Sequence, residues 1–498
     1  MRFAVFENTI IPDKLLDSTE KTLPISSIEK IPHQQINPSY QYNQELQQQL
    51  SGKQLLLDDL AYPISEVHQH YENGYLQYRK GIITEKNKLS CNRCGNRDKH
   101  LFAWFPCARC GEKCFYCRKC IMMGRVTTCT PLLSWTGPES QLNETGPQLN
   151  WSGTLSEGQQ TASKRVEEAV LNNKELLVWA VCGAGKTEVL FEGIDAALTT
   201  GKRVCLATPR TDVVLELTPR LKKVFPNIPV ASLYGGSEDR HLNAPLTITT
   251  THQLLRFYQA FDTVILDEVD AFPYSVDETL KFAVRQSRKQ VSSMIYLTAT
   301  PNEKWQKECS QGRREFVTIP ARFHRHPLPV PHFTWCGNWE KQLKKERLPQ
   351  NVFQWIKKRL DSQKQSLLFI PKIDKMERIL PIVQQLHPKI EAVHAEDPLR
   401  KEKVQAMRNK EIPMLLTTTI LERGVTFPNI DVAVIGAEDR IFTESALVQI
   451  AGRVGRSSHA PGGDITFFHY GKTEAMIRAR KQILHMNVEA RRKGLIDY

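Results

Sequence analysis

Residues 176–187 read LLVWAVCGAGKT, an apolar run followed by a glycine-rich turn and a Lys-Thr pair. The apolar run predicts a buried β-strand, and the residues after it predict a helix over 188–197. Backbone N–H groups at such a strand-turn-helix junction surround phosphates, while Lys186 reaches the β and γ phosphates and Thr187 binds Mg²⁺. The stretch therefore predicts an ATP-binding loop in an α/β fold. Its predicted nucleotide-binding residues are Ala180, Gly183, Ala184, Gly185, Lys186 and Thr187.

A second apolar run, residues 263–266, ends about 80 residues after the loop in the acidic tetrad Asp267-Glu268-Val269-Asp270. Carboxylates at the carboxyl end of a parallel strand lie where α/β folds bind their ligands. We expect Asp267 to hold Mg²⁺ through water and Glu268 to orient or deprotonate the attacking water. An acidic tetrad alone is typical of a solvated loop, but its order and distance from the glycine loop favour a hydrolytic site.

Short apolar runs alternate with helical patterns from residue 155 onward, which predicts parallel doubly wound sheets. The Pro- and His-rich stretch 319–332 interrupts the rhythm, and a second series begins at 367. The predicted fold class is α/β, with two tandem RecA-like parallel-sheet lobes. The expected domains are an N-terminal region (1–85) without a recognisable role, a cysteine-rich zinc module (86–130), a linker (131–153), an ATP-binding lobe (154–325) and a C-terminal lobe (326–498).

The composition is that of a globular, basic chain of 498 residues, with 67 Lys and Arg against 54 Asp and Glu and a net charge of +13. Such a charge favours a polyanionic partner, either nucleic acid or an anionic membrane surface, although a solvated basic surface is an equal alternative. The N-terminus has no signal-peptide pattern, and no apolar run is long enough to span a bilayer. We therefore expect a cytoplasmic protein whose membrane contacts are peripheral.

Eight of the twelve cysteines lie between residues 91 and 129, as Cys-x-x-Cys-Gly turns and closely spaced single cysteines. Cys-x-x-Cys lets two thiolates reach one Zn²⁺, and four thiolates complete a tetrahedral site. Pairing Cys91 and Cys94 with Cys117 and Cys120 gives a zinc ribbon, whereas pairing them with Cys107 and Cys110 gives a shorter finger. A second ion held by Cys107, Cys110 and Cys114 with Cys129 is a further arrangement, and an iron–sulfur cluster is the chemical rival to zinc.

Basic and aromatic residues are interleaved with these cysteines and could clamp phosphates and stack bases. A basic mini-domain with aromatics as its small core is the equal alternative. The residues concerned are Arg93, Arg97, Lys99, Trp104, Phe105, Arg109, Lys113, Phe115, Tyr116, Arg118, Lys119 and Arg125.

The stretch Gln449-Ile450-Ala451-Gly452-Arg453-Val454-Gly455-Arg456 places two arginines three residues apart, which predicts that both lie on one helix face. Arg453 and Arg456 can then reach a γ-phosphate and stabilise transition-state charge as arginine fingers. Because they belong to the second predicted lobe, hydrolysis is expected to open and close the cleft between the lobes.

The ordered motifs from Gln159 to Arg456 resemble superfamily 2 helicases, whose phosphate loop reads A-x-x-G-x-G-K-T and so matches Ala180. The resemblance implies that Gln159 reads adenine, with Gln160 as the neighbouring alternative, and that Gln449 belongs to the nucleotide site. It also implies that Thr298 and Thr300 couple hydrolysis to lobe movement. The backbone contacts to nucleic acid that it implies are Thr208, Arg210, Thr251, Thr418 and Thr419, and Thr426 departs from the common motif by replacing an Asp.

A narrower resemblance rests on residues 116–125, on the acidic tetrad continuing into Ala271-Phe272-Pro273, and on Ala321-Arg322-Phe323-His324 before a Pro-rich run. From about Cys91 to the C-terminus the chain resembles the ComFA family of late competence proteins of transformable Gram-positive bacteria. The resemblance implies an ATPase that binds single-stranded DNA and helps draw it through a membrane channel from the cytoplasmic face. It favours Cys91, Cys94, Cys117 and Cys120 as zinc ligands, and an oligomer is compatible with it.

Two other functions compete with DNA uptake. A replication-restart helicase resembling PriA shares the motif around Arg453, but its cysteines lie inside the second lobe instead of before the first. A DNA-binding scaffold with a vestigial ATPase is disfavoured because Lys186, Asp267, Glu268 and both arginines are intact.

Overall fold

The computed structural model describes residues 1–17, 20–86, 88–139, 146–422 and 427–497. The chain divides into two compact units, each of which combines separate stretches of sequence. Unit 1 consists of Met1–Ser152, Val166–Leu176 and Phe191–Tyr296, and unit 2 of Gly153–Arg165, Leu177–Leu190 and Leu297–Tyr498.

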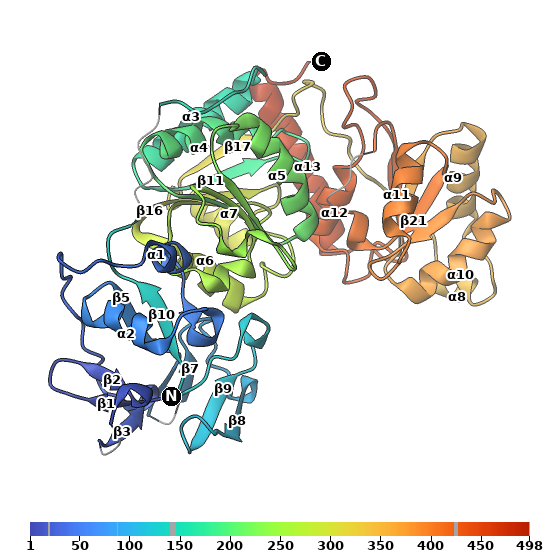
Figure 1. Ribbon diagram of the computed structural model, residues 1–498. Coiled ribbons are helices and arrows are strands. Elements are labelled where there is room, and N and C mark those ends of the chain that lie inside the picture. Colours follow the sequence, from blue (N-terminus) through green and yellow to red (C-terminus); the bar gives the residue numbers. More distant parts are fainter. Residues whose placement is uncertain (18–19, 87, 140–145, 423–426, 498) are drawn as a thin grey trace. The chain divides into compact units, whose positions relative to one another are not determined.

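The N-terminal part of unit 1 is built from small antiparallel sheets. Their strand orders are β2-β1-β3 and β4-β10-β5, with the hairpins β6-β7 and β8-β9. Aromatic residues form much of the core, with Phe3, Tyr71 and Tyr78 each at most 1% exposed. Helix α2 packs against β5 in this core (Figure 1). The strands are β1 (Arg2–Val5), β2 (Ile10–Pro12), β3 (Thr22–Pro24), β4 (Leu55–Leu56), β5 (Leu76–Lys80), β6 (Ile82–Glu85), β7 (Lys88–Cys91), β8 (Phe102–Pro106), β9 (Lys113–Cys117) and β10 (Pro131–Trp135).

Strand β10 corrects the predicted linker over 131–153, because its five residues pair antiparallel with β5. Leu132 and Leu133 are both fully buried, so β10 completes the N-terminal core. The cysteine-rich segment lies between β10 and the earlier strands of this core in the sequence. The sequence between residues 1 and 135 is therefore one folded region interrupted by the cysteine-rich insertion.

The first lobe contains the sheet β13-β14-β12-β15-β16-β11-β17 among the described residues. All residues of β12 and β14 are buried, as expected for strands covered on both faces. The register pairs Ala207 with Leu266, which brings the end of β12 beside the start of the acidic tetrad. The strands are β11 (Glu175–Ala180), β12 (Val204–Thr208), β13 (Val230–Leu233), β14 (Leu246–Thr250), β15 (Phe261–Leu266), β16 (Arg288–Thr298) and β17 (Phe316–Ile319).

The second lobe contains the sheet β18-β23-β22-β19-β21-β20, in which every described pairing is parallel. Its strands β19, β21, β22 and β23 are buried throughout. The prediction of two α/β parallel-sheet lobes is thereby confirmed. The strands are β18 (His332–Trp335), β19 (Ser366–Phe369), β20 (Glu391–Val393), β21 (Met414–Thr417), β22 (Asp431–Ile435) and β23 (Ile465–His469).

Helices cover these sheets, with short 3₁₀ turns at several junctions. The α-helices are α1 (Gln44–Leu50), α2 (Ile64–Glu72), α3 (Glu157–Leu171), α4 (Phe191–Thr199), α5 (Thr211–Val224), α6 (Glu278–Ser287), α7 (Glu303–Ser310), α8 (Trp339–Leu343), α9 (Gln350–Asp361), α10 (Ile373–Gln384), α11 (Arg400–Arg408), α12 (Glu444–Ala451) and α13 (Glu474–Arg492). The 3₁₀ turns are η1 (Asp13–Leu15), η2 (Ile25–Ser27), η3 (Leu57–Asp59), η4 (Lys99–Leu101), η5 (Ile121–Met123), η6 (Glu188–Leu190), η7 (Asp239–His241), η8 (Gln253–Arg256) and η9 (Thr419–Leu421).

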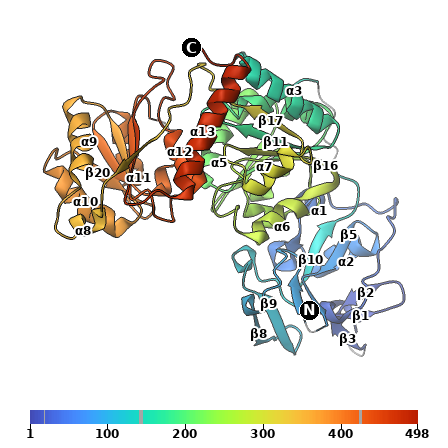
Figure 2. The ribbon, with the colours of Figure 1, turned by 180° about the vertical axis from the view of Figure 1, so that it is seen from behind.

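The long helix α13 packs against α12 and also against residues that were predicted to belong to the first lobe (Figure 2). Lys493 Nζ donates to Thr318 Oγ1 of β17 at 2.7 Å, and Ala490 is buried beside Ala321. The C-terminal helix is therefore not confined to the second lobe. Among the described residues, no helix is both long and apolar enough to cross a membrane.

Candidate nucleotide site and metal centres

The phosphate loop follows β11 directly, as predicted, and its backbone is held in a form that only glycine adopts easily. Gly185 has a φ of +68°, and a Cβ at this position would lie 2.3 Å from the side-chain nitrogen of Gln159. Lys186 and Thr187 are both half-buried, at the start of the segment that leads through η6 into α4. The loop is therefore compact, with a conformation fixed partly by Gln159.

Gln159 is 3% exposed, whereas the neighbouring Gln160 is exposed. The Gln159 side chain donates to the carbonyl of Ala184 at 2.9 Å and accepts from the backbone N–H of Ser156 at 2.8 Å. The structure thus brings Gln159 to the phosphate loop and leaves Gln160 away from these contacts.

The two arginines of the second lobe do not share a helix face, which corrects the sequence prediction. Helix α12 ends at Ala451, and the residues from Gly452 to Gly455 form turns. Gly455 has a φ of +68°, in the left-handed region that glycine favours, so the chain leaves the helix instead of extending it. Arg453 is 1% exposed, and Arg456 is half-buried with Nε donating to the carbonyl of Gly452 at 2.9 Å.

The phosphate loop is in direct contact, within unit 2, with α12 and with the residues 452–456 that follow it, which we call the arginine segment. The Cys182 thiol donates to Gln449 Oε1 at 3.0 Å. A Cβ on Gly452 would lie 2.4 Å from Cys182 Cβ, so the two backbones approach as closely as glycine allows. A Cβ on Gly183 would likewise lie 3.9 Å from Arg456 Cγ. The structure therefore brings the loop, Gln449 and Arg456 together.

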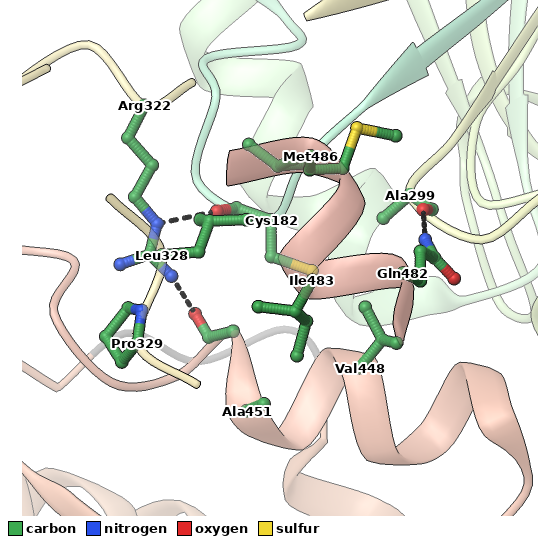
Figure 3. Close-up of a pocket in the computed structure, with 12 residues that line it drawn as sticks. Cys182, Ala299, Arg322, Leu328, Pro329, Val448, Ala451, Gln482, Ile483 and Met486 are labelled. Carbon is green, nitrogen blue, oxygen red and sulfur yellow. Dashed lines mark hydrogen bonds between the residues drawn. The ribbon is translucent and has the colours of Figure 1, made fainter. Parts of the chain in front are cut away.

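Arg322 joins the same two segments and was missed as a site residue, because the sequence showed it only as part of a family signature. Its guanidinium is 2% exposed and donates to the carbonyl of Cys182 at 3.0 Å (Figure 3). It also donates to the carbonyls of Val454 at 2.7 Å, Gly452 at 3.0 Å, and Gly455. Burial, with Arg456 nearby, lowers the pKa of Arg322 to about 10, at which the side chain is still charged near neutral pH.

The acidic residues lie in unit 1, at the carboxyl end of β15. The Asp267 backbone N–H donates to the carbonyl of Ala207 at 2.9 Å, and Asp267 Oδ1 accepts from the Glu268 N–H at 2.8 Å. Glu268 has a φ of +55°, an uncommon conformation for a residue other than glycine, and both side chains are half-buried. Strained backbone of this kind is common at functional sites.

The threonines predicted to couple the lobes form a connected pair in unit 2. Thr298 Oγ1 accepts from the Thr300 N–H at 2.9 Å, and Thr300 Oγ1 donates to Ser445 Oγ of α12 at 2.8 Å. Trp179 of β11 donates to the carbonyl of Ala299 between them at 3.0 Å. The strand before the phosphate loop is thus linked through this turn to the helix that precedes the arginines.

The predicted nucleic-acid contacts differ in accessibility. Thr208 and Thr251 are fully buried, and Arg210 pairs with Asp212 at 2.7 Å. Thr418 and Thr419 are half-buried, while Arg423, Gly424, Val425 and Thr426 of the same predicted motif lie outside the described residues.

The cysteine-rich segment gathers Cys91, Cys94, Cys117 and Cys120 into one cluster, as the family resemblance implied. All four are buried, and their sulfurs lie within 4.8 Å of one another. The Sγ–Sγ distances are 3.8 Å for Cys91 to Cys120 and 3.6 Å for Cys94 to Cys117. A tetrahedral Zn²⁺ with Zn–S bonds of about 2.3 Å separates its sulfurs by about 3.8 Å, so this donor set fits zinc.

Arg93 is buried against this cluster, so of the two interpretations given for the basic residues of this segment the phosphate-binding one does not hold for Arg93. It is 2% exposed, and its Nη2 donates to Cys120 Sγ at 3.2 Å and to the Cys120 carbonyl at 2.6 Å. Asn96 Nδ2 also lies 3.7 Å from Cys117 Sγ. Such donors orient thiolate ligands and partly offset their negative charge.

Cys107 and Cys110 lie in a separate cluster with Cys114 and Cys129, so the predicted shorter finger that paired them with Cys91 and Cys94 does not form. The hairpin β8-β9 runs beside both clusters. Trp104 on this hairpin is 55% exposed, with Lys113 Nζ 4.2 Å above its ring.

Three sequence families match the chain in order. A model of the competence protein ComFA N-terminal domain matches residues 34–134, one of the type III restriction enzyme res subunit matches 152–303, and one of the helicase conserved C-terminal domain matches 344–458. Competence protein ComFA of Bacillus subtilis (strain 168) is 48% identical over 446 residues, covering 90% of this chain and 96% of that protein. The chain belongs to the ComFA family.

The ComFA relationship extends beyond the part predicted from sequence, because the N-terminal model begins at residue 34 and not near Cys91. ComFA of Streptococcus pneumoniae (strain ATCC BAA-255 / R6) is 41% identical over 82% of this chain and 92% of that protein. The ATP-dependent DNA helicase RecG of S. pneumoniae serotype 4 is 23% identical over 64% of this chain and 51% of that protein. This ComFA chain is thus a competence-related helicase or translocase of superfamily 2 and a DNA-dependent ATPase, which uses nucleotide and Mg²⁺.

Proposed function

We propose that this ComFA chain is an ATP-driven single-stranded DNA translocase that draws transforming DNA into the cell. The observation that carries the proposal is the set of hydrogen bonds that join the phosphate loop at Cys182 to Gln449 of α12 and, through Arg322, to the arginine segment after α12. A change in the loop on hydrolysis must strain or release these bonds, and so must move the segment that shares them. Coupling of this kind is what a translocase needs.

In this proposal Gln159 donates to the carbonyls of Ala184 and Gly185 and so holds the loop with the N–H groups of residues 183–185 directed toward the phosphates. Lys186 neutralises charge on the β and γ phosphates. Glu268 orients or deprotonates the attacking water, while Thr187 and Asp267 would hold Mg²⁺, which supplies charge compensation at the phosphates. Gln159 also reads adenine.

Arg453 and Arg456 then stabilise charge that develops at the γ-phosphate, with Gln449 fixing their segment through its bond to Cys182. Thr298 and Thr300 transmit the change, because Thr300 is bonded to α12. Arg453 lies within a turn and Arg456 directly follows it, so small displacements of Gly452 and Gly455 would move both arginines relative to the phosphate loop.

The proposed DNA-binding surface consists of residues from the helicase motifs and of the β8-β9 hairpin. Thr208 and Thr251 are buried, so the accessible contact of the first lobe falls on the half-buried Arg210. Trp104, with Lys113 over its ring, offers a stacking surface for a base beside a charge for its phosphate. These groups read no base edges, so binding should be tolerant of sequence and sensitive to salt.

We further propose that Cys91, Cys94, Cys117 and Cys120 hold a structural Zn²⁺. By family resemblance, the chain works at the cytoplasmic face, in peripheral contact with a membrane DNA channel. Fractionation of competent cells should recover part of the chain with membranes, and a high-salt wash should release it because the contact is peripheral.

The test is ATP turnover of the full-length protein with and without single-stranded DNA, alongside displacement of streptavidin from a biotinylated strand and unwinding of a forked duplex. We expect strong stimulation by single-stranded DNA, streptavidin displacement and little unwinding. Turnover independent of DNA would contradict the proposal, efficient fork unwinding would favour a restart helicase resembling PriA, and absence of turnover would favour a scaffold.

A further inference from the structure

Four cysteines of this segment are not part of the first zinc site, and their sulfur atoms form a second cluster. The Sγ atoms of Cys107, Cys110, Cys114 and Cys129 lie within 4.8 Å of one another, and Cys107 Sγ lies 3.8 Å from Cys129 Sγ. Each residue is at most 5% exposed, and none is in a disulfide. The spacing is too long for an S–S bond of about 2.05 Å and matches two sulfurs on one tetrahedral ion.

The backbone around these cysteines repeats the construction of the first site. The Gly111 N–H donates to the Cys107 carbonyl at 2.8 Å, as the Gly95 N–H does to the Cys91 carbonyl. Gly111 has a φ of +69° and Gly95 one of +71°, so both turns bring a pair of thiols to one side. The remaining two thiols come from β9 and from the turn before β10, as Cys114 and Cys129.

Packing alone does not explain why four thiols are buried here. The only hydrophobic side chain that packs against this cluster among the described residues is the half-buried Phe105. A group of four small thiols with so little apolar cover contributes little hydrophobic stabilisation, whereas one metal ion would bind all four. We propose that Cys107, Cys110, Cys114 and Cys129 bind a second Zn²⁺, which fixes the β8-β9 hairpin to the N-terminal sheets.

The two sites contact different parts of unit 1. The second site touches the N-terminal sheets, since Arg2 of β1 donates to the Cys110 carbonyl at 2.8 Å and the Ser26 N–H donates to the Thr128 carbonyl at 3.1 Å. Arg109 also pairs with Asp58 at 2.8 Å. The ion therefore ties the hairpin to residues early in the chain.

The first site instead faces α6 of the ATPase lobe. Gln286 donates to the Asn92 carbonyl at 2.9 Å, and Lys119 pairs with Asp277 at 3.0 Å. A Cβ on Gly95 would lie 2.6 Å from the ring of Phe282, so the knuckle itself packs on the helix. The β8-β9 hairpin, which carries Trp104, is then fixed on two sides. The second ion connects it to the N-terminal sheets, and the first ion lies on the side of α6.

The experiment is zinc content of the purified full-length chain, by elemental analysis and by native mass spectrometry. We expect about two Zn²⁺ per wild-type chain and about one in the double variant Cys110→Ser/Cys114→Ser. The matched variant Cys94→Ser/Cys117→Ser should also keep about one, and Cys309→Ser, which alters a buried cysteine outside both clusters, should keep about two.

Wild-type protein also answers the question without any variant. X-ray absorption at the zinc edge should show sulfur-only coordination with Zn–S distances of about 2.3 Å. One zinc per wild-type chain, unchanged zinc in Cys110→Ser/Cys114→Ser, iron in place of zinc, or a disulfide in native mass spectra would each overturn the proposal. Because DNA-stimulated turnover is measured separately, any of these outcomes leaves the proposed translocase function standing.

Discussion

Replacing Arg322 with Met should strongly lower ATP turnover, although Arg322 is not itself a predicted nucleotide contact. The buried guanidinium donates to the carbonyl of Cys182 in the phosphate loop and to carbonyls of Gly452, Val454 and Gly455 in the arginine segment. Methionine fills much of the same volume but donates no hydrogen bond. The change therefore removes the connection while leaving the apolar packing largely intact.

The magnitude follows from the bonds that are lost. A hydrogen bond to a charged group contributes roughly 1.5–3 kcal/mol, so four bonds give about 6–12 kcal/mol in gross terms. The cost of burying the charge, visible in the lowered pKa of Arg322, offsets part of this sum, and water can reach some of the released carbonyls. A net loss of about 3 kcal/mol, felt in the transition state, corresponds to a fall in kcat of about 100-fold.

The assay is steady-state ATP hydrolysis at saturating single-stranded DNA, with kcat and the KM for ATP measured separately. The KM should change much less than kcat, because Gln159 and Lys186 stay in place. Arg322→Lys keeps the charge but presents only one donor group, so it should recover part of kcat. Arg325→Met is the matched control, since Arg325 lies three residues away and forms an exposed pair with Asp497 at 2.9 Å.

A kcat for Arg322→Met within twofold of wild type, in a variant with a wild-type circular dichroism spectrum, would refute the reasoning. An equal loss in Arg325→Met would also count against it, because exposed pairs contribute at most about 1 kcal/mol. A rise in KM with unchanged kcat would mean that Arg322 serves nucleotide binding and not the coupling of the two segments.

Three further changes test other parts of the site. Lys186→Ala should abolish turnover in the ATPase assay and leave single-stranded DNA binding within twofold by fluorescence anisotropy, since the lysine is proposed to contact only the phosphates of the nucleotide. Trp104→Ala should weaken DNA binding by about 1–3 kcal/mol, whereas Trp335→Ala, at another exposed tryptophan, should leave it unchanged. Thr300→Val removes the bond to Ser445 and should lower the distance moved per ATP more than it lowers ATP turnover, measured by streptavidin displacement per phosphate released.

Each of these predictions has a result that contradicts it. Normal hydrolysis by Lys186→Ala would show that the phosphate loop is assigned wrongly. Equal losses of affinity in Trp104→Ala and Trp335→Ala would remove the β8-β9 hairpin from the DNA path. Proportional losses of movement and turnover in Thr300→Val would mean that the bond to Ser445 supports the fold without coupling.

The sequence by itself determined the two lobes and the phosphate loop, because both depend on local patterns. Buried parallel strands are continuously apolar, and the predicted apolar run at 263–266 falls inside the observed strand β15. The loop could be recognised because glycine is needed where Gly185 meets Gln159. The family resemblance supplied the grouping of Cys91, Cys94, Cys117 and Cys120, which spacing alone had left open.

Only the tertiary structure decided the features that depend on contacts between distant residues. The helix predicted through Arg453 ends early because Gly455 takes a left-handed conformation and the carbonyls beyond α12 accept from Arg322. Residues 131–135 form a strand because β5, about 50 residues earlier, offers a partner edge. No local pattern encodes such partners, since a hydrogen bond depends on where two groups meet in space and not on their spacing along the chain.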